Sequence, residues 1–267
     1  MRRILAAIAL VCGAQAGLAA DVPTADLDAM RGADIVLLGE IHDNPAHHAG
    51  QGAVIRAISP TAVVFEMLTP EMAEKLAEVG LSDLEVLDAA IGWEASGWPP
   101  IQIYAPVFEA LGDAQVFGAA LPRETVRAAF ADGAAAVFGA DAERFGLTEP
   151  LPAAEAEARE EMQFQAHCEA MPREMMGGMV EAQRLRDARF SQVALDALAE
   201  FGAPVVVIVG SGHVRQDWGM PAVLARAAPK VSVFALAFGE GAGGGAYDAE
   251  VVTSAPARGD PCEVFRR

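Results

Sequence analysis

The sequence predicts an α/β protein in which a mostly parallel central sheet is flanked by helices and carries a helical insertion, or lid. Short, continuous apolar runs such as 35–38, 62–65 and 205–209 are typical of strands that are buried on both faces. Longer helical stretches alternate with these runs, which favours parallel strands joined by crossover helices. The 267 residues, of which 53% are hydrophobic, suit one large domain or two small ones and exclude a disordered chain. We expect a single domain over 21–267.

Turn and cap residues separate the expected elements. Asn44 and Pro45 supply an N-cap and a helix-opening proline after the first strand, and Thr69 with Pro70 opens the helix after the second. The glycine-rich segment 239–245 joins the last two strands and is expected to form a hairpin tip. Strands are expected at 35–38, 62–65, 115–117, 205–209, 231–238 and 247–252. Helices are expected at about 45–58, 70–79, 122–145, 153–169 and 172–201.

The helical insertion is expected over about 122–201. An alanine-rich stretch begins it, and two long helices complete it. These two helices are separated at Met171 and Pro172, because proline cannot continue the hydrogen-bond ladder of a helix.

The first 20 residues have the layout of a secretory signal peptide. Arg2 and Arg3 give a positive start, an apolar run follows, and small residues lead to Ala20, where we expect cleavage. The apolar run is too short to span a bilayer as a helix. Cys12 follows a poor lipobox, so we expect export to the periplasm without a lipid anchor.

The charge of the chain is strongly negative. Its 19 Lys and Arg residues stand against 37 Asp and Glu residues, for a formal net charge of -18. Nucleic acid and anionic membrane surfaces are therefore poor partners. No later apolar run approaches the length of a transmembrane helix, so none is expected in the mature chain.

Two cysteines remain after the signal peptide, Cys168 and Cys262. An oxidising compartment permits a disulfide between them, which would tie the C-terminal tail to the end of a helix. The alternatives are a buried thiol and a soft metal ligand.

Acidic and imidazole side chains follow three of the expected strands. Glu40 and His42 come directly after the first strand, Glu66 ends the second, and His213 follows the 205–209 strand. Both histidines lie in a G-x-x-H pattern, in which glycine lets the backbone turn sharply and approach a ligand closely. Ligands of open α/β sheets bind beyond the carboxyl ends of the strands, so we expect these side chains to share one cleft.

The residue types of this cleft suit two kinds of chemistry. His42, Glu66 and His213 could hold a divalent transition metal, with Glu40 as general base. The same residues could instead form carboxylate–histidine pairs for acid–base catalysis. The alternative is that each of them only caps a helix or orders a turn.

A second group of candidates lies on the two long helices of the insertion. A methionine-rich surface is adaptable and could hold a flat apolar ligand, or copper through its thioethers. The alternative is a filled core. Gln183, Arg186 and Asp187 share one helical face. This face is either an ordinary solvated surface or, because it is close in sequence to the methionines, part of a lid over a pocket. The candidate lid residues are His167, Met175, Met179, Gln183 and Arg186.

Three further residues are candidates for the wall of a pocket. Trp98 and Tyr104 belong to an irregular, proline-rich stretch that either walls a pocket or is a loop pinned by its prolines. Arg215, just after His213, is the best candidate for binding an anionic group.

Several short patterns in the same order resemble the ChaN-type haem-binding uptake family. That family is grouped with the Tiki/TraB-like proteins and the erythromycin esterases, which share G-x-x-H strand ends and an α/β fold. The resemblance covers about 34–265. It rests on the segments 38–43, 65–67, 167–168, 182–184 and 210–215.

The resemblance implies a periplasmic haem-binding protein of haem or iron uptake, and a homodimer as one arrangement. Haem would be held at the carboxyl ends of the strands and under the methionine-rich lid. Its iron takes a histidine or tyrosine ligand, which leaves Tyr104, Tyr247 and the histidines as candidates. The residues expected to contact it are Trp98, Tyr104, His167, Met175, Met179, Gln183, Arg186, His213 and Arg215.

The relatives of this family imply a different function. Tiki-like proteins are regarded as metal-dependent peptidases, and the erythromycin esterases use a His/Glu site. The alternative is therefore a metal-dependent hydrolase that cleaves an ester or a peptide bond with Glu40, His42, Glu66 and His213.

Overall fold

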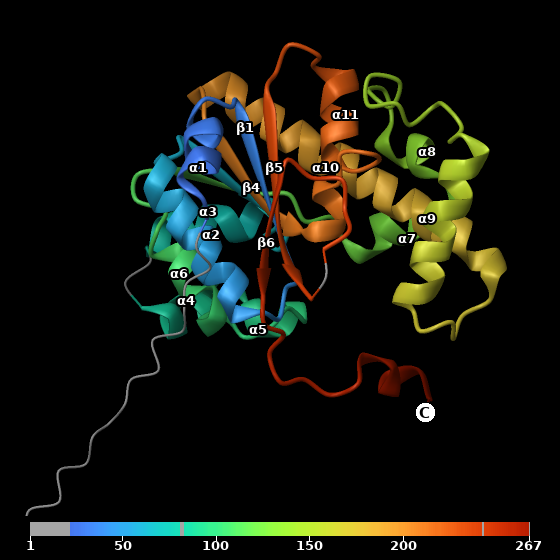
Figure 1. Ribbon diagram of the computed structural model, residues 1–267, viewed down its shortest axis with the longest axis horizontal. Coiled ribbons are helices and arrows are strands. Elements are labelled where there is room, and N and C mark those ends of the chain that lie inside the picture. The colour runs from blue at the N-terminus through green and yellow to red at the C-terminus, as the bar shows by residue number, and fades with distance from the viewer. Residues whose placement is uncertain (1–21, 81–82, 242, 267) are drawn as a thin grey trace, which may run out of the picture.

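The computed structural model describes residues 22–80, 83–241 and 243–266. The signal peptide expected over 1–20, together with Cys12, lies outside the described residues. A six-stranded sheet forms the centre of the described part of the chain (Figure 1), with the strand order β3-β2-β4-β1-β5-β6. The strands are β1 (Ile35–Glu40), β2 (Ala62–Phe65), β3 (Gln115–Gly118), β4 (Val205–Gly210), β5 (Val233–Glu240) and β6 (Ala249–Thr253).

All pairs of neighbouring strands in this sheet are parallel. The pairing of β1 with β4 runs from Ile35 opposite Val205 to Glu40 opposite Gly210. Every residue of these two strands is buried, as expected for central strands with both faces covered. Since β4 lies between β2 and β1, the carboxyl ends of these three strands are neighbours.

Alternate side chains along the strands belong to two separate apolar cores. Val36 and Leu38 of β1 belong to one core, and Ile35 and Leu37 of the same strand belong to the other. The first core is closed by α1 (Thr24–Arg31), α2 (Pro45–Ile58), α3 (Pro70–Val79), α4 (Leu84–Ile91), α5 (Trp93–Ser96) and α6 (Ala105–Phe108). The second is closed by α7 (Arg123–Asp132), α8 (Ala134–Phe138), α10 (Met176–Phe201) and α11 (Met220–Ala227).

The helix α9 (Ala153–Ala166) packs on α10, and α10 continues from there across the molecule, where it packs on β2 and β4 (Figure 1). The break between them is confirmed at Met171 and Pro172, after which one short 3₁₀ turn leads into α10. The expected helix over 122–145 is instead divided into α7 and α8. Gly133 separates them with a φ of 87°, a backbone conformation that favours glycine.

The expected hairpin at the end of the chain is wrong, because β5 and β6 pair in parallel. The chain between them therefore runs back along the sheet, so that β6 points in the same direction as β5. A further difference is that the irregular stretch expected around Trp98 and Tyr104 contains a 3₁₀ turn over Ile101–Tyr104 and leads into α6. The helices α4 and α5, which precede it, were not among the expected elements.

The disulfide between Cys168 and Cys262 is confirmed, with Cα atoms 5.6 Å apart. It joins the segment after α9 to the C-terminal 3₁₀ helix Pro261–Arg266. The tail that connects β6 to this helix runs towards the α9 side of the molecule (Figure 1). Within the described residues, no helix has both the length and the apolar character needed to cross a membrane.

Candidate functional site

A pocket of about 630 Å³ lies at the carboxyl ends of the central strands. His42, Glu66, Gly210 and His213 line it from β1, β2 and β4, which are adjacent in the sheet. The helices α9 and α10 cover it from the other side. The pocket lining also includes Trp98, Arg123, Arg159, Gln183, Arg186 and Asp187.

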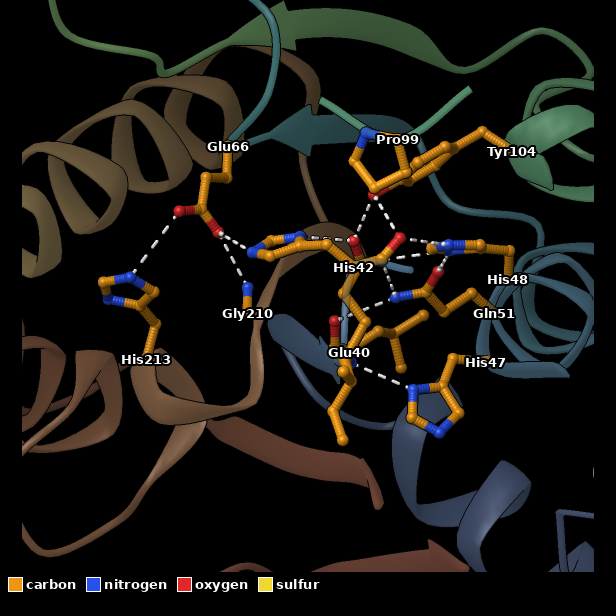
Figure 2. Close-up of polar contacts among 12 residues, drawn as sticks. Glu40, His42, His47, His48, Gln51, Glu66, Pro99, Tyr104, Gly210 and His213 are labelled. Carbon is orange, nitrogen blue, oxygen red and sulfur yellow. Dashed lines mark hydrogen bonds and ion pairs between the residues drawn. The ribbon is translucent and has the colours of Figure 1, made fainter. Parts of the chain in front are cut away.

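Glu66 lies between the two imidazoles of the pocket (Figure 2). Its Oε2 is 3.8 Å from Nε2 of His42, and its Oε1 is 3.6 Å from Nε2 of His213. The backbone N–H of Gly210 donates a hydrogen bond of 2.7 Å to Oε2. A single carboxylate therefore faces two basic nitrogen atoms, one from each G-x-x-H strand end.

His42 is held from behind by Glu40. Its Nδ1 lies 2.7 Å from Oε1 of Glu40, which leaves Nε2 directed towards Glu66 (Figure 2). Burial lowers the pKa of His42, but the hydrogen bond to Glu40 and the charge of Glu66 outweigh burial and raise that pKa above its ordinary value. His42 is therefore a more basic imidazole than a free one.

Glu40 itself is buried and is surrounded by donors. Tyr104 donates its hydroxyl to Oε1 at 2.6 Å, and Gln51 donates its amide to Oε2 at 2.7 Å. Nδ1 of His48 lies 3.3 Å from the same Oε2. Burial raises the pKa of Glu40, but the hydrogen bonds from His42 and His48 hold it well below its usual range. The carboxylate is thus ionised inside the protein because its partners compensate the lost hydration.

Burial also shifts the pKa of three other side chains in this region, Tyr104, His48 and His47. Burial and the charge of Glu40 raise the pKa of Tyr104 far above its usual value, so its phenol stays protonated. Burial lowers the pKa of His48, but its hydrogen bond to Glu40 raises it above the ordinary value overall. Burial lowers the pKa of His47, whose Nδ1 accepts a hydrogen bond from the backbone N–H of Ile41.

His213 has an equivalent arrangement on the other side of Glu66. Its Nδ1 lies 2.6 Å from Oδ1 of Asp187, and Oδ2 of Asp187 lies 3.7 Å from Nη2 of Arg159. Burial lowers the pKa of His213, but the charges of Asp187 and Glu66 raise it above the ordinary value. The pocket therefore contains two carboxylate-held imidazoles whose Nε2 atoms face one shared carboxylate.

Aromatic rings flank both imidazoles. The indole of Trp98 lies with its centroid 4.7 Å from that of His42, and the ring of Phe190 meets His213 edge-on at 5.1 Å. Met162 and Val180 add apolar surface from α9 and α10. Apolar side chains therefore lie directly beside the charged groups in the lining of the pocket.

Four of the residues expected to act together are brought to one place. His42, Glu66 and His213 line the pocket, and Glu40 supports His42 from beneath it. Among the described residues, however, no group of three or more His, Cys, Asp or Glu side chains has an arrangement suited to holding a metal ion. The expected metal ligands thus converge without forming a ready-made metal site.

The candidate lid is only partly as expected. Gln183 and Arg186 line the pocket from α10, as does Trp98 from the segment after α5. Met175 and Met179 do not line it, because the face of α10 turned to the pocket carries residues 180, 183, 186 and 187. His167 lies beside the disulfide instead, with its ring 6.2 Å from that of Phe265.

Tyr104 and Arg215 also lie outside the pocket lining. The Tyr104 side chain is fully buried, and its hydroxyl is committed to Glu40. Arg215 donates to Asp217 at 2.9 Å and stacks on the ring of Trp218 at 4.1 Å. Its charge is therefore matched by Asp217, and it does not line the pocket.

Residues that sequence reasoning missed or left aside complete the pocket. Asp187 was expected only as part of a helical face, yet it orients His213. Arg123 and Arg159 reach the pocket from α7 and α9, and nothing in the local sequence marks them. A buried aspartate four residues after Gln183 on a pocket-facing helix was the one available signal.

The chain is similar to a known protein family and to solved structures. The family model described as haem-binding uptake, Tiki superfamily, ChaN matches residues 27–224. A solved structure of cofacial heme binding to ChaN of Campylobacter jejuni covers 80% of this chain and 84% of its own, with 19% identity and a TM-score of 0.58. An erythromycin esterase mutant in its open conformation covers 79% and 71%, with 14% identity and a TM-score of 0.44. No curated protein sequence matches.

The matched range 27–224 contains the three strand ends and both helices that cover the pocket. The resemblance found in the motifs is thereby confirmed, and the likeness to the Campylobacter jejuni protein shows the same fold. This chain belongs to the ChaN family of haem-binding uptake proteins in the Tiki superfamily.

Proposed function

We propose that this protein binds haem in the strand-end pocket and serves haem or iron uptake in the periplasm. The observation that carries the proposal is that imidazoles held by carboxylates lie beside aromatic rings in one pocket of about 630 Å³. Pockets of roughly 300–1,000 Å³ are usual for small molecules and cofactors. Membership of a haem-binding uptake family supports the same assignment.

The donor set of the pocket fits an iron porphyrin. An imidazole that gives Nδ1 to a carboxylate keeps Nε2 for a metal and becomes a stronger ligand. His42, with Glu40, and His213, with Asp187, both have this arrangement. Imidazole is a common axial ligand of haem iron. These two histidines replace Tyr104 as the ligand candidates.

The apolar side chains of the pocket suit the flat macrocycle of a haem. Trp98 and Phe190 offer aromatic surface beside the imidazoles, and Met162 with Val180 adds aliphatic surface from the helical lid. We therefore propose a lid formed by α9 and α10 whose contacts come from these residues and from Gln183. The methionines Met175 and Met179 are not needed for it.

Titration with hemin tests this proposal. Wild-type protein should give a saturable shift of the Soret band, and the band position should change in His42→Ala or His213→Ala. The matched control is His167→Ala, because His167 lies beside the disulfide and away from the pocket. The absence of a saturable shift in wild-type protein, or an equal loss in the His167 variant, would contradict the proposal.

Export and assembly are part of the same proposal. The disulfide supports an oxidising compartment, because such bonds persist outside the cytosol. Fractionation of cells that express the full chain should recover an oxidised, processed protein from the periplasm. For the proposed homodimer, size-exclusion chromatography with and without hemin should show a mass of two chains.

Hydrolysis is a second candidate, favoured by one observation: Glu66 lies between two imidazoles that are each supported by another carboxylate. In an ester hydrolysis, one imidazole would take a proton from water, the resulting hydroxide would add to the carbonyl carbon, and the other imidazolium would protonate the leaving alkoxide. A panel of esters and peptides, with and without added divalent metal, tests this. Turnover that is lost in Glu66→Gln would support it, and no turnover in any condition would exclude it for that panel.

A further inference from the structure

Two arginines line the pocket without a partner. Within the described part of the chain, Arg123 and Arg186 make no hydrogen bond and no ion pair, although both face the pocket. Arg186 is half-buried on α10, while Arg123 begins α7 and is exposed. The guanidinium of Arg123 lies beside the segment that carries Trp98, since a Cβ at Gly97 would lie 3.7 Å from its Nη2.

The acidic groups of the pocket do not need these arginines. Glu66 already faces His42 and His213 and accepts the N–H of Gly210. Asp187 is matched by His213 and by Arg159. Each carboxylate of the pocket lining is therefore compensated by its own neighbours.

The other cations near the pocket differ from this pair. Arg159 is buried and lies 3.2 Å from Glu155 and 3.7 Å from Asp187. Arg215 is paired with Asp217. The positive charge that remains available to a ligand thus comes from Arg123 and Arg186. Both lie in a chain with a net charge of -18, which by itself repels anions.

We propose that Arg123 and Arg186 bind carboxylate groups of the pocket's ligand, which restricts the site to flat apolar molecules that carry carboxylates. This inference rests on the proposed haem-binding function and names the chemical class that the same pocket selects. A guanidinium offers a planar pair of N–H donors that matches a carboxylate, and such charge-assisted bonds are stronger than neutral ones. A tetrapyrrole dicarboxylic acid has both features, whereas its diester keeps the ring and loses the charges.

Binding of protoporphyrin IX and of its dimethyl ester, measured by porphyrin fluorescence with the wild-type protein, tests this directly. We expect the ester to bind at least about tenfold more weakly, the ratio expected from losing one charge-assisted hydrogen bond. Arg186→Gln should weaken binding of the diacid by about tenfold, and Arg123→Gln by less because its side chain is exposed. Arg127→Gln is the matched control, since Arg127 lies on α7 and does not line the pocket.

The outcomes separate the two proposals. Equal affinity for diacid and diester would overturn the arginine assignment and leave haem binding intact. Unchanged diacid binding in the Arg123 and Arg186 double variant would do the same. If neither porphyrin nor hemin binds, the proposed function fails and the assignment fails with it. The comparison of the two porphyrins uses unaltered protein, so it does not depend on the folding of any variant.

Discussion

Glu40 is buried inside the protein, and its carboxylate lies 2.7 Å from Nδ1 of His42, two residues further along the chain. Glu40 is the last residue of the central strand β1 and His42 follows the strand, and the two side chains have different roles. Glu40 holds a permanent charge beneath the pocket, and His42 presents Nε2 to it. This relationship gives the strand end its chemical character, because it determines which imidazole nitrogen faces a ligand.

Replacing Glu40 by Gln should destabilise the fold. The glutamine amide has the same shape as the carboxylate, but it is no longer a charged acceptor for Tyr104, Gln51 and His42. In addition, its NH₂ group is itself a donor and would face other donors. We expect the free energy of unfolding to fall by about 3 kcal/mol, as for other broken buried networks. Urea denaturation of wild type and Glu40→Gln measures this. Glu109→Gln, at an exposed position, is the control, and a loss below about 0.5 kcal/mol in Glu40→Gln would contradict the expectation.

Stability should fall as the pH rises above the ordinary histidine pKa of about 6.5. The pKa values of His42, His48 and His213 are raised in the folded protein, so the folded state holds their protons more tightly than the unfolded chain. Their contribution is complete below the ordinary histidine pKa of about 6.5 and is lost as the pH rises through the folded-state values. His47 acts in the opposite direction, because burial lowers its pKa.

The slope of stability against pH measures this effect. Between about pH 6 and about pH 8.5, the unfolding free energy of wild type should decrease more than that of His213→Gln, which lacks one of the raised groups. NMR titration of the imidazoles gives the separate values, with His42 and His213 above 6.5 and His47 below it. Equal slopes in the two proteins would show that His213 has no raised pKa.

Gly52 allows its helix to pack closely against a neighbouring segment. It lies in α2, where a Cβ would overlap the carbonyl group of Pro106 at the start of α6. Alanine in a helix interior is normally better than glycine by about 0.5–1 kcal/mol. Here we expect Gly52→Ala to cost about 2–3 kcal/mol, because backbone must move. Gly212→Ala, which meets nothing within 4 Å, should change stability little. A stabilised Gly52→Ala protein would contradict this packing.

The disulfide should add stability without being needed for the pocket. Cys168 and Cys262 are 94 residues apart in sequence, and a loop of that size is expected to contribute up to about 4–5 kcal/mol through the unfolded chain. Since Cys262 lies in a largely exposed tail, we expect about 2–4 kcal/mol for the Cys168→Ser and Cys262→Ser double variant. Unfolding in urea measures the loss, and hemin titration should be unaffected. Loss of hemin binding on reduction would place the tail in the binding site.

The strand ends were predictable because parallel strands direct their carboxyl ends to one edge. Glu40, His42, Glu66 and His213 could therefore be placed together from local patterns alone. The helix α2 followed in the same way, since Asn44 caps it through the N–H of Ala46 and Pro45 opens it. The parallel pairing of β5 and β6 was not predictable from their glycine-rich connection, because pairing depends on where the chain returns to the sheet.

The covering helices were not predictable to the same degree. Their pocket-facing residues depend on the rotation of α10 against the sheet, and sequence spacing does not give that rotation. This rotation directs Gln183 and Arg186 to the pocket, whereas Met175 and Met179 lie outside the pocket lining. Arg123 shows the same limit, because it reaches the pocket only through the docking of α7.

If haem occupies the strand-end pocket beside the imidazoles, the position of its iron reveals this. Crystals of the protein soaked with hemin, measured at the iron absorption edge, locate the metal by anomalous scattering. We expect an iron peak in this pocket, within bonding distance of Nε2 of His42 or His213. Iron found elsewhere, for example beside His167 or Met175, would contradict it.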